Sequence, residues 1–311
     1  MEIKKIDISQ HTHAHYRPSW FDDFIWQEDI KKVLKTAIDS SKKTTKPIWH
    51  ILFLGQAGYG KTTLAQIVAN DINKGIKIVT WYALSKPADL ISILNTLSDG
   101  DIFFIDEIHR LAPKIEEMLY TAMEDHVIDM VMPDGGSLRL PIQPFTLIGA
   151  TTKSDHLSKP LKSRFVYKFH FIDYDEDEKK KIIWYYLNRL WLKGDNITIN
   201  QLHHIIDSIP REIQNMCVRV YDYVISKKLD KNLQTQDVED FIIRNKVEKW
   251  GITPIQKKYL DILSSHQKPV WLKTIAIKMW LDEKSIEEDI EPLLIKLGKI
   301  EKTLHGRVLW S

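Results

Sequence analysis

The chain has 311 residues, a length at which two or three domains are expected rather than one hydrophobic core. Its composition, 43% hydrophobic and 28% charged, is that of a globular protein, and a net charge of +2 excludes a uniformly basic nucleic-acid-binding chain. A single cysteine, Cys217, excludes a disulfide framework and a cysteine-built zinc site. The apolar runs are too short to span a membrane and the N-terminal segment lacks a signal-peptide pattern, so we expect a cytoplasmic protein.

Predicted strands and helices alternate through the first half of the chain. Short apolar runs bounded by loop residues predict buried strands over 49–54, 76–81, 102–105 and 145–150. Apolar residues at helical spacing predict helices over 27–41, 62–70, 88–97 and 115–124. The alternation predicts an α/β domain in which helices cover both faces of a parallel sheet.

The strand pattern stops after Phe171. Helical patterns over 176–191, 201–208, 212–227 and 236–246 predict a small all-helical domain. Three further predicted helices, over 254–264, 272–279 and 285–297, precede two short strand-like pieces over 300–304 and 307–310, which is the order of a winged helix. We therefore predict three domains, over 1–172, 173–246 and 247–311.

The ten tryptophans are scattered through the chain, mostly inside apolar periodic segments. We expect them to pack in hydrophobic cores rather than to stack on nucleic-acid bases. Cys217 lies within a helical pattern and is expected to be a small buried apolar residue.

A phosphate-binding loop follows the first predicted strand. Residues 55–62 read GQAGYGKT and match the pattern G-x-x-x-x-G-K-[ST] in full, between a predicted strand and a predicted helix. Its glycines allow a tight turn whose N–H groups face phosphate oxygens, its lysine reaches the β- and γ-phosphates, and its threonine hydroxyl ligates Mg²⁺. The predicted nucleotide contacts are Gly55, Gly58, Gly60, Lys61, Thr62 and Thr63.

Two carboxylates end the third predicted strand. The run Ile102–Ile105 is apolar and is followed at once by Asp106 and Glu107. Asp106 is placed to hold Mg²⁺ next to Thr62, and Glu107 to orient and polarise the attacking water. Acidic residues at a strand end are weak evidence alone, but after a complete phosphate loop they predict ATP hydrolysis.

Several strings around these residues resemble the RuvB family of AAA+ ATPases. They are Arg17-Pro18, Asp106–Arg110, Tyr120–Asp125, Phe145–Thr152 and Pro160–Phe165. The resemblance runs from about Arg17 to the C-terminus. It implies an AAA+ core with a helical lid and a winged helix, and a helicase that uses ATP and Mg²⁺ to drive branch migration of Holliday junctions.

The resemblance also implies roles for individual residues. Thr152 would stand at sensor 1, where a hydroxyl contacts the γ-phosphate or positions the lytic water. Arg164 would be an arginine finger that reaches the ATP of a neighbouring subunit. Arg211, after Pro210, would be sensor 2 in the lid. The adenine would lie near Arg17, Phe24 and Ile25.

The implied partners are double-stranded DNA at four-way junctions, RuvA and further copies of the chain in a hexameric ring. The wing would contact the DNA backbone through Lys302, His305 and Arg307. The hairpin predicted over Met130–Pro141, with its tip at Asp134–Gly136, would dock RuvA. The acidic last helix is not expected to read bases, and its stripe of Ile286, Ile290, Leu293, Leu294 and Leu297 is expected to be core.

Three alternatives remain open at this point. The first is a related AAA+ machine with another client, such as a clamp loader, against which DEIHR, the winged-helix tail and the lack of a zinc-module pattern in the sequence argue. A nucleotide-switched DNA-binding protein that scarcely turns over is disfavoured by Glu107, Thr152 and Arg164 occurring together. The winged helix could contact protein rather than DNA.

We expect Glu107→Gln to bind ATP with unchanged affinity and to hydrolyse it at least about 10²-fold more slowly, because an amide cannot accept the proton of the attacking water. Nucleotide affinity and phosphate release measure the two quantities, and Glu117→Gln on the following predicted helix is the control. Normal turnover in Glu107→Gln would remove this residue from its assigned role.

Overall fold

The computed structural model describes residues 17–25, 27–131, 137–206, 209–245, 252–266 and 268–310. The chain divides into two compact units, with the boundary between Tyr174 and Asp175. This boundary is close to the predicted one at 172/173, whereas the division of the second part into a lid and a winged helix at 246/247 stays a prediction. Among the described residues, no helix is long and apolar enough to cross a membrane.

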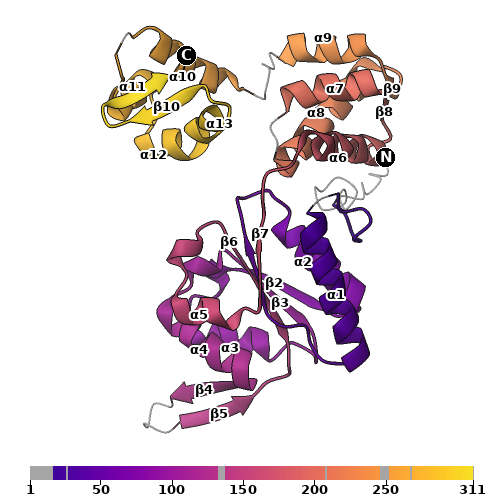
Figure 1. Ribbon diagram of the computed structural model, residues 1–311, viewed down its shortest axis with the longest axis vertical. Helices are drawn as coiled ribbons and strands as arrows, with labels where there is room; N and C mark the ends of the chain where they lie inside the picture. Colours follow the sequence, from indigo (N-terminus) through magenta and orange to yellow (C-terminus); the bar gives the residue numbers. More distant parts are fainter. Residues whose placement is uncertain are drawn as a thin grey trace, which may run out of the picture. The chain divides into compact units, whose positions relative to one another are not determined.

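The first unit is built on a five-stranded parallel sheet (Figure 1). Its strands, in spatial order, are β2 (Ile76–Thr80), β3 (Ile102–Asp106), β6 (Thr146–Thr151), β1 (Ile51–Leu54) and β7 (Tyr167–His170). Every residue of β1 and β6 is buried, which explains the uninterrupted apolar sequence of β1 and the largely apolar interior of β6. The predicted α/β fold with a parallel sheet is confirmed.

The edge strand β7 was not predicted. Only Phe169 of its four residues is buried, while Lys168 and His170 are exposed. A short strand at the edge of a sheet therefore lacks the apolar run that marks the central strands.

Helices cover both faces of this sheet. Figure 1 shows α1 (Glu28–Thr44) and α2 (Lys61–Ile72) on one side, and α3 (Pro87–Leu94) and α4 (Pro113–Asp125) on the other. A buried hydrophobic cluster joins α3 and α4 to the sheet through residues such as Leu90, Leu119 and Phe103. The short helix α5 (Lys159–Arg164), which the sequence did not predict, begins at Ser158, whose hydroxyl accepts from the Leu161 N–H.

A β-hairpin follows α4. Strand β4 (Val127–Val131) pairs antiparallel with β5 (Ser137–Pro141), and Arg139 Nε donates to Asp129 Oδ1 across the pair at 2.9 Å. The strands of the predicted hairpin are confirmed, and its predicted tip at 134–136 lies outside the described residues.

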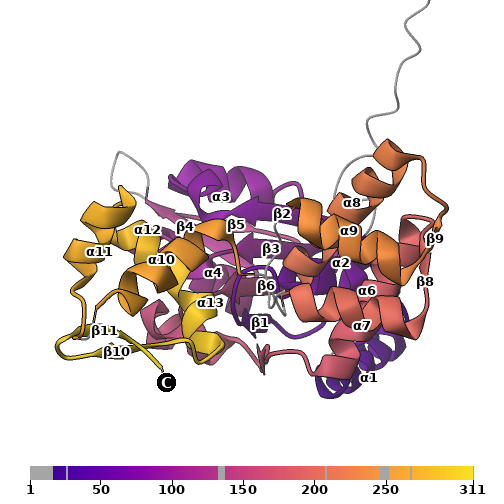
Figure 2. The same cartoon turned by 90° about the horizontal axis from the view of Figure 1, so that it is seen from above.

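The second unit begins with a helical group. Figure 2 shows α6 (Glu176–Arg189), α7 (Asn196–Ile205), α8 (Pro210–Lys227) and α9 (Thr235–Asn245) packed together. Two strands of two residues each, β8 (Lys193–Gly194) and β9 (Asn232–Leu233), pair in parallel between the helices. The sequence predicted an all-helical region here, without these short strands. Cys217 is fully buried in α8, as predicted.

The C-terminal part contains α10 (Pro254–Ser264), α11 (Leu272–Met279), α12 (Glu283–Ser285), a π-helical turn (Ile286–Ile290), α13 (Glu291–Lys296) and the hairpin β10 (Ile300–Thr303) with β11 (Gly306–Leu309). The sequence predicted one helix over 285–297. Pro292 lacks the N–H that a continuous α-helix requires, which accounts for the change in helix type just before it. The predicted core residues Ile286, Ile290 and Leu294 are buried, and Leu293 and Leu297 are half-buried.

The prediction that the tryptophans are core residues is wrong for every tryptophan that the structure describes. Their exposed fractions range from 37% at Trp81 to 90% at Trp280. Several flank an element rather than lie within it: Trp49 precedes β1, Trp271 precedes α11, and Trp280 follows it. An apolar run in the sequence does not distinguish its buried middle from its exposed ends.

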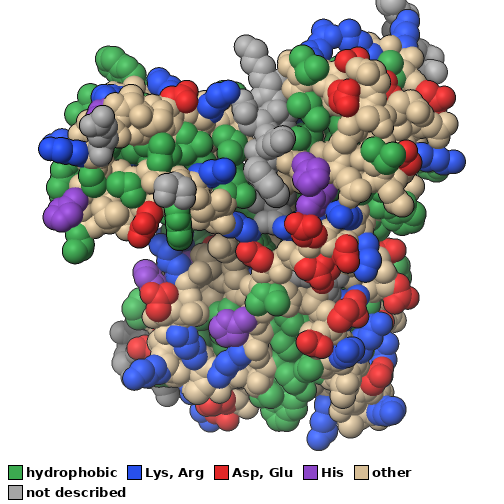
Figure 3. Space-filling model, turned by 45° about the horizontal axis from the view of Figure 1, so that its top comes forward, with side chains coloured by type: hydrophobic (Ala, Val, Ile, Leu, Met, Phe, Trp, Pro, Cys, Tyr) green, Lys and Arg blue, Asp and Glu red, His purple; other side chains and the backbone are tan. Residues whose placement is uncertain are grey.

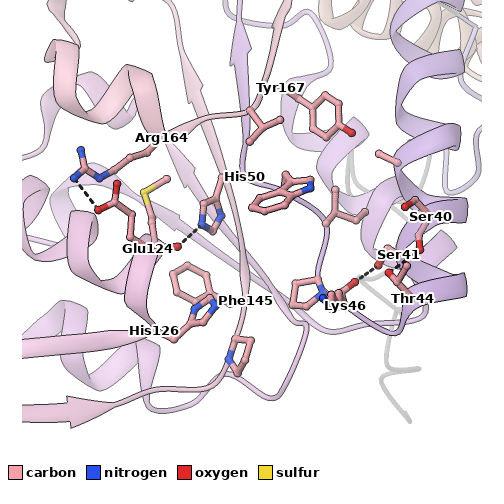
Figure 4. A pocket seen from close by; sticks show the side chains of 17 residues that line it. Ser40, Ser41, Thr44, Lys46, His50, Glu124, His126, Phe145, Arg164 and Tyr167 are labelled. Carbon is pink, nitrogen blue, oxygen red and sulfur yellow. Dashed lines mark hydrogen bonds and ion pairs between the residues drawn. The ribbon is translucent and has the colours of Figure 1, made fainter.

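His50 joins three elements of the first unit at the start of β1 (Figure 4). Its Nδ1 accepts from the Leu147 N–H of β6 at 2.8 Å, so its Nε2 carries the proton and donates to the Met123 carbonyl of α4 at 3.1 Å. Burial lowers the pKa of His50 to about 4, although the hydrogen bond to Met123 opposes this and the nearby His126 adds to it.

We expect this histidine to make the first unit less stable in mild acid. The unfolded chain takes up a proton at His50 below its ordinary pKa of 6.5, whereas the folded chain does so only near 4. The contribution of neutral His50 to the free energy of unfolding is complete above pH 6.5. It falls by about 3 kcal/mol as the pH is lowered from 6.5 to about 4.

Urea unfolding of the wild type and of His50→Phe at several pH values would measure the difference. The variant should lose this part of the pH dependence, whatever its stability at neutral pH. An identical pH slope in both proteins would contradict the assignment.

Candidate nucleotide-binding and hydrolysis site

The predicted phosphate loop connects β1 to α2, as the sequence pattern requires. Gly58 and Gly60 have φ values of 86° and 88°, in the region that glycine adopts without steric cost. A Cβ on Gly55 would lie 2.7 Å from Cβ of Phe171, so only glycine fits there. Lys61 Nζ donates to the carbonyl oxygens of Gly55 and Gln56 at 2.6 and 2.8 Å, which keeps the ammonium group at the loop.

Asp106, Glu107 and Thr152 lie with the phosphate loop at the carboxyl ends of the strands, whereas the predicted arginine finger, Arg164, does not. The loop follows β1, Thr152 follows β6, and Asp106 ends β3, and these three strands are neighbours in the order β3-β6-β1. The Gly55 N–H donates to the Thr151 carbonyl at 3.1 Å, which ties the start of the loop to the end of β6. Parallel register therefore brings together residues that are far apart in the sequence. Thr62 and Thr63 lie in the first turn of α2, next to Lys61.

Glu107 sits in a left-handed backbone conformation, with φ at 51°. A non-glycine residue in this region is uncommon and is found often at functional sites. Its side chain contacts Thr152, because Oε2 accepts from the Thr152 N–H at 3.3 Å and from the Thr152 hydroxyl at 3.1 Å. The predicted water-activating carboxylate and the predicted sensor 1 hydroxyl are thus directly bonded.

His109 is a member of this cluster that the sequence analysis did not single out. Its Nδ1 lies 3.1 Å from Glu107 Oε2 and 2.8 Å from the Thr151 hydroxyl, and its side chain is only 5% exposed. Burial lowers the pKa of His109, against the opposing effect of Glu107, so the ring is neutral at neutral pH. The available signal was its place in DEIHR, two residues after Glu107.

Tyr59 is a second such residue. It is buried within the phosphate loop, and its hydroxyl donates to Asp173, which lies just before the boundary between the two units. Together with the close approach of Gly55 to Phe171, this bond fixes the loop against the segment that leads into the second unit. The sequence gave no signal for this pairing, because 114 residues separate the partners.

The segment predicted to lie near adenine packs beside the phosphate-loop helix. Phe24 is buried, its carbonyl accepts from Lys31 Nζ at 2.8 Å, and the Ser19 carbonyl accepts from Asn70 of α2 at 3.0 Å. Arg17 and Ile25 are half-buried in the same segment. Pro210 and Arg211, in contrast, form the first turn of α8 in the second unit, and the roles of all five stay predictions.

Arg164 lies at the opposite ends of the strands, near their amino termini. It lines a cavity of about 760 Å³ whose walls include residues that precede the strands, among them Trp49, His50 and Phe145 (Figure 4). The guanidinium donates to Glu124 at 3.1 Å and to the Pro160 carbonyl at 2.9 Å, and it stacks over the Tyr120 ring at 4.3 Å. Arg164 is therefore held in place by residues of its own chain, away from the phosphate loop.

The comparisons with known proteins agree with this geometry. Residues 16–171 match the family model described as the Holliday junction DNA helicase RuvB P-loop domain, and residues 249–310 match the RuvB C-terminal winged helix domain. The Holliday junction branch migration complex subunit RuvB of Campylobacter fetus is 36% identical, over 99% of this chain and 91% of that protein. Its counterpart from Campylobacter lari is 38% identical, over 99% and 93%.

The solved structure of the Thermotoga maritima RuvB Holliday junction branch migration motor is also similar, with a TM-score of 0.79 and 33% identity over 95% of both chains. The chain belongs to the RuvB family. The P-loop fold, the helical region and the winged helix predicted from the sequence are all confirmed by this membership.

The winged helix of this RuvB-family chain contains a buried ion-pair network that involves two of the predicted DNA contacts. Arg307 Nε donates to Glu291 at 2.9 Å and its Nη2 donates to Glu287 at 2.7 Å, while Lys302 Nζ lies 2.6 Å from Glu291. Glu291 is fully buried and also accepts from the Tyr259 hydroxyl at 2.8 Å. Burial alone would raise the pKa of Glu291, but the hydrogen bonds from Arg307, Lys302 and Tyr259 lower it, so the carboxylate stays charged.

These contacts compensate the charges of Arg307 and Lys302 inside the domain, and the side chain of Arg307 is only 13% exposed. His305, at the exposed turn of the wing, has no acidic partner among the described residues. On the face drawn in Figure 3, basic and acidic side chains are interspersed, in keeping with the near-zero net charge. The assignment of all three wing residues to DNA contact stays a prediction.

We expect Arg307→Ala to destabilise the winged helix by about 3–5 kcal/mol, because it leaves the buried Glu291 carboxylate without its main partner. Urea unfolding followed by tryptophan fluorescence would measure the loss. Lys299→Ala, which removes an exposed charge next to the same hairpin, should change stability by less than about 0.5 kcal/mol. Equal stability of the two variants would show that Arg307 is not the structural partner of Glu291.

Proposed function

We propose that this chain is the ATP-hydrolysing motor subunit that drives branch migration of Holliday junctions, as a homohexameric ring recruited by RuvA. The full-length similarity to proteins named as branch migration complex subunits supports the activity. The match to a RuvB winged helix over 249–310 favours this function over a clamp loader. ATP binding follows from the P-loop domain, and we extend the proposal to Mg²⁺ as its cofactor.

Each residue of the proposed hydrolysis site has a chemical task. The N–H groups around Gly58 and Gly60 and the ammonium of Lys61 bind phosphate oxygens. Thr62 and Asp106 hold Mg²⁺, which is commonly bound through one or two protein oxygens together with substrate phosphates. Glu107 accepts the proton of the attacking water, and Thr152 acts as sensor 1 beside it.

The position of Arg164 is the observation that carries the ring assembly. Arg164 lies among residues at the amino ends of the strands, whereas the phosphate loop lies at their carboxyl ends. Strand β1 has four residues, so the amino and carboxyl ends of the strands are separated by about 13 Å. An arginine at that distance acts on the ATP of a neighbouring copy and not on its own.

The remaining contacts complete the proposal. Arg17, Phe24 and Ile25 hold the adenine, and Pro210 and Arg211 provide sensor 2 from a lid that spans 173–246. The winged helix over 247–311 contacts the DNA backbone through its wing, with Lys302, His305 and Arg307 as the proposed contacts. The hairpin over 130–141 docks RuvA.

A complementation experiment tests the function and the trans arrangement together. Arg164→Ala retains a complete phosphate loop, and Glu107→Gln retains the arginine. In the presence of junction DNA and RuvA, the rate of ATP hydrolysis should fall at least about 10³-fold in Arg164→Ala alone and at least about 10²-fold in Glu107→Gln alone. A mixture should regain activity, because the Glu107→Gln subunits supply Arg164 to the intact sites of their neighbours.

Lys159→Ala, an exposed cation on the same short helix as Arg164, is the matched control and should keep full activity. If a mixture of the two variants shows no recovery of ATP hydrolysis, the trans arrangement is contradicted. Hydrolysis that does not change with protein concentration or with junction DNA would contradict the motor function.

A further inference from the structure

One oxygen of the Glu107 carboxylate carries all of its hydrogen bonds. Oε2 accepts from the N–H and the hydroxyl of Thr152 and lies 3.1 Å from Nδ1 of His109. The other oxygen, Oε1, has no hydrogen-bond partner among the residues that the structure describes. A carboxylate fixed through one oxygen presents the second one in a defined direction, where it can accept a proton from water.

The surrounding bonds determine which nitrogen of His109 holds the proton. Nδ1 lies 3.1 Å from the carboxylate oxygen Oε2, and because two lone pairs at that distance repel each other, hydrogen on Nδ1 is favoured. The Thr151 hydroxyl donates to the Lys153 carbonyl at 3.2 Å, and its oxygen accepts from the Lys153 N–H at 3.0 Å. That oxygen can therefore accept from Nδ1 of His109 at 2.8 Å, and the same N–H group lies close to Glu107, with Nδ1 3.1 Å from Oε2, where its positive end attracts the carboxylate.

The packing of His109 leaves it little freedom. Its side chain is almost completely buried, Thr151 is fully buried in the last position of β6, and the His156 ring stands at 84° to the His109 ring with 5.9 Å between centroids. The histidine is thus anchored to β6 on one side and to the residue that follows β3 on the other.

We propose that His109 is a positioning residue for hydrolysis, which together with Thr152 fixes Glu107 through Oε2 and turns Oε1 toward the attacking water. This inference rests on the proposed role of Glu107 as the base. His109 itself does not touch the nucleotide. Its loss should therefore lower kcat while the KM for ATP and the affinity for nucleotide remain unchanged.

Three substitutions separate this role from packing. In His109→Asn the amide nitrogen stands where Nδ1 stood, in His109→Gln the amide extends one bond too far, and in His109→Leu no donor remains. We expect kcat to fall about tenfold in the Leu and Gln variants, and by less than about threefold in the Asn variant. The measurements are ATP hydrolysis by the full chain with junction DNA and RuvA, and equilibrium binding of a fluorescent ATP analogue.

A double-variant comparison guards against a general folding defect. In a Glu107→Gln background, His109→Leu should cause no further loss of the residual rate, because the group it positions has already been removed. An equal tenfold loss in both backgrounds, or equal losses in the Asn and Leu variants, would overturn the proposal. Normal turnover in Glu107→Gln alone would instead refute the role of Glu107, and that result is independent of the His109 variants.

Discussion

Parallel pairing of β1, β6 and β3 is the constraint on which the candidate site depends. Because the three strands run in one direction, the residues that follow them meet at one edge of the sheet. A phosphate loop, a hydroxyl and two acidic side chains from three distant parts of the chain are brought together in this way. The central strands are buried on both faces, so a change of register would carry a large cost in apolar packing.

The same constraint separates Arg164 from the loop. Residues at the amino ends of the strands form a second group, in which Glu124, Tyr120 and Pro160 hold the guanidinium. The candidate hydrolysis site and Arg164 therefore lie at opposite ends of the same strands. Under the proposed function, Arg164 completes the site of a neighbouring copy, so efficient hydrolysis of ATP requires assembly.

Polar networks in the two units illustrate two uses of buried charge. Glu107 is partly exposed, and its hydrogen bonds engage one oxygen while the other remains available for chemistry. Glu291 is fully buried, and Arg307, Lys302 and Tyr259 engage both of its oxygens, so it fastens the wing to α13. In the proposed function the first glutamate acts on water, whereas the second holds the wing together.

The sequence by itself determined the α/β core, the order of most helices and the chemistry of the phosphate loop and acidic strand end, because these depend on local periodicity and on residues adjacent in the chain. It could not detect the edge strand β7, the short helix α5 or the exposure of the tryptophans, because each depends on what packs against the segment. Only the tertiary structure decided that His109 meets Thr151, that Tyr59 meets Asp173 and that Arg307 is neutralised by Glu291. The partners in each pair come from different elements, so the spacing of residues along the chain does not predict that they are hydrogen-bonded.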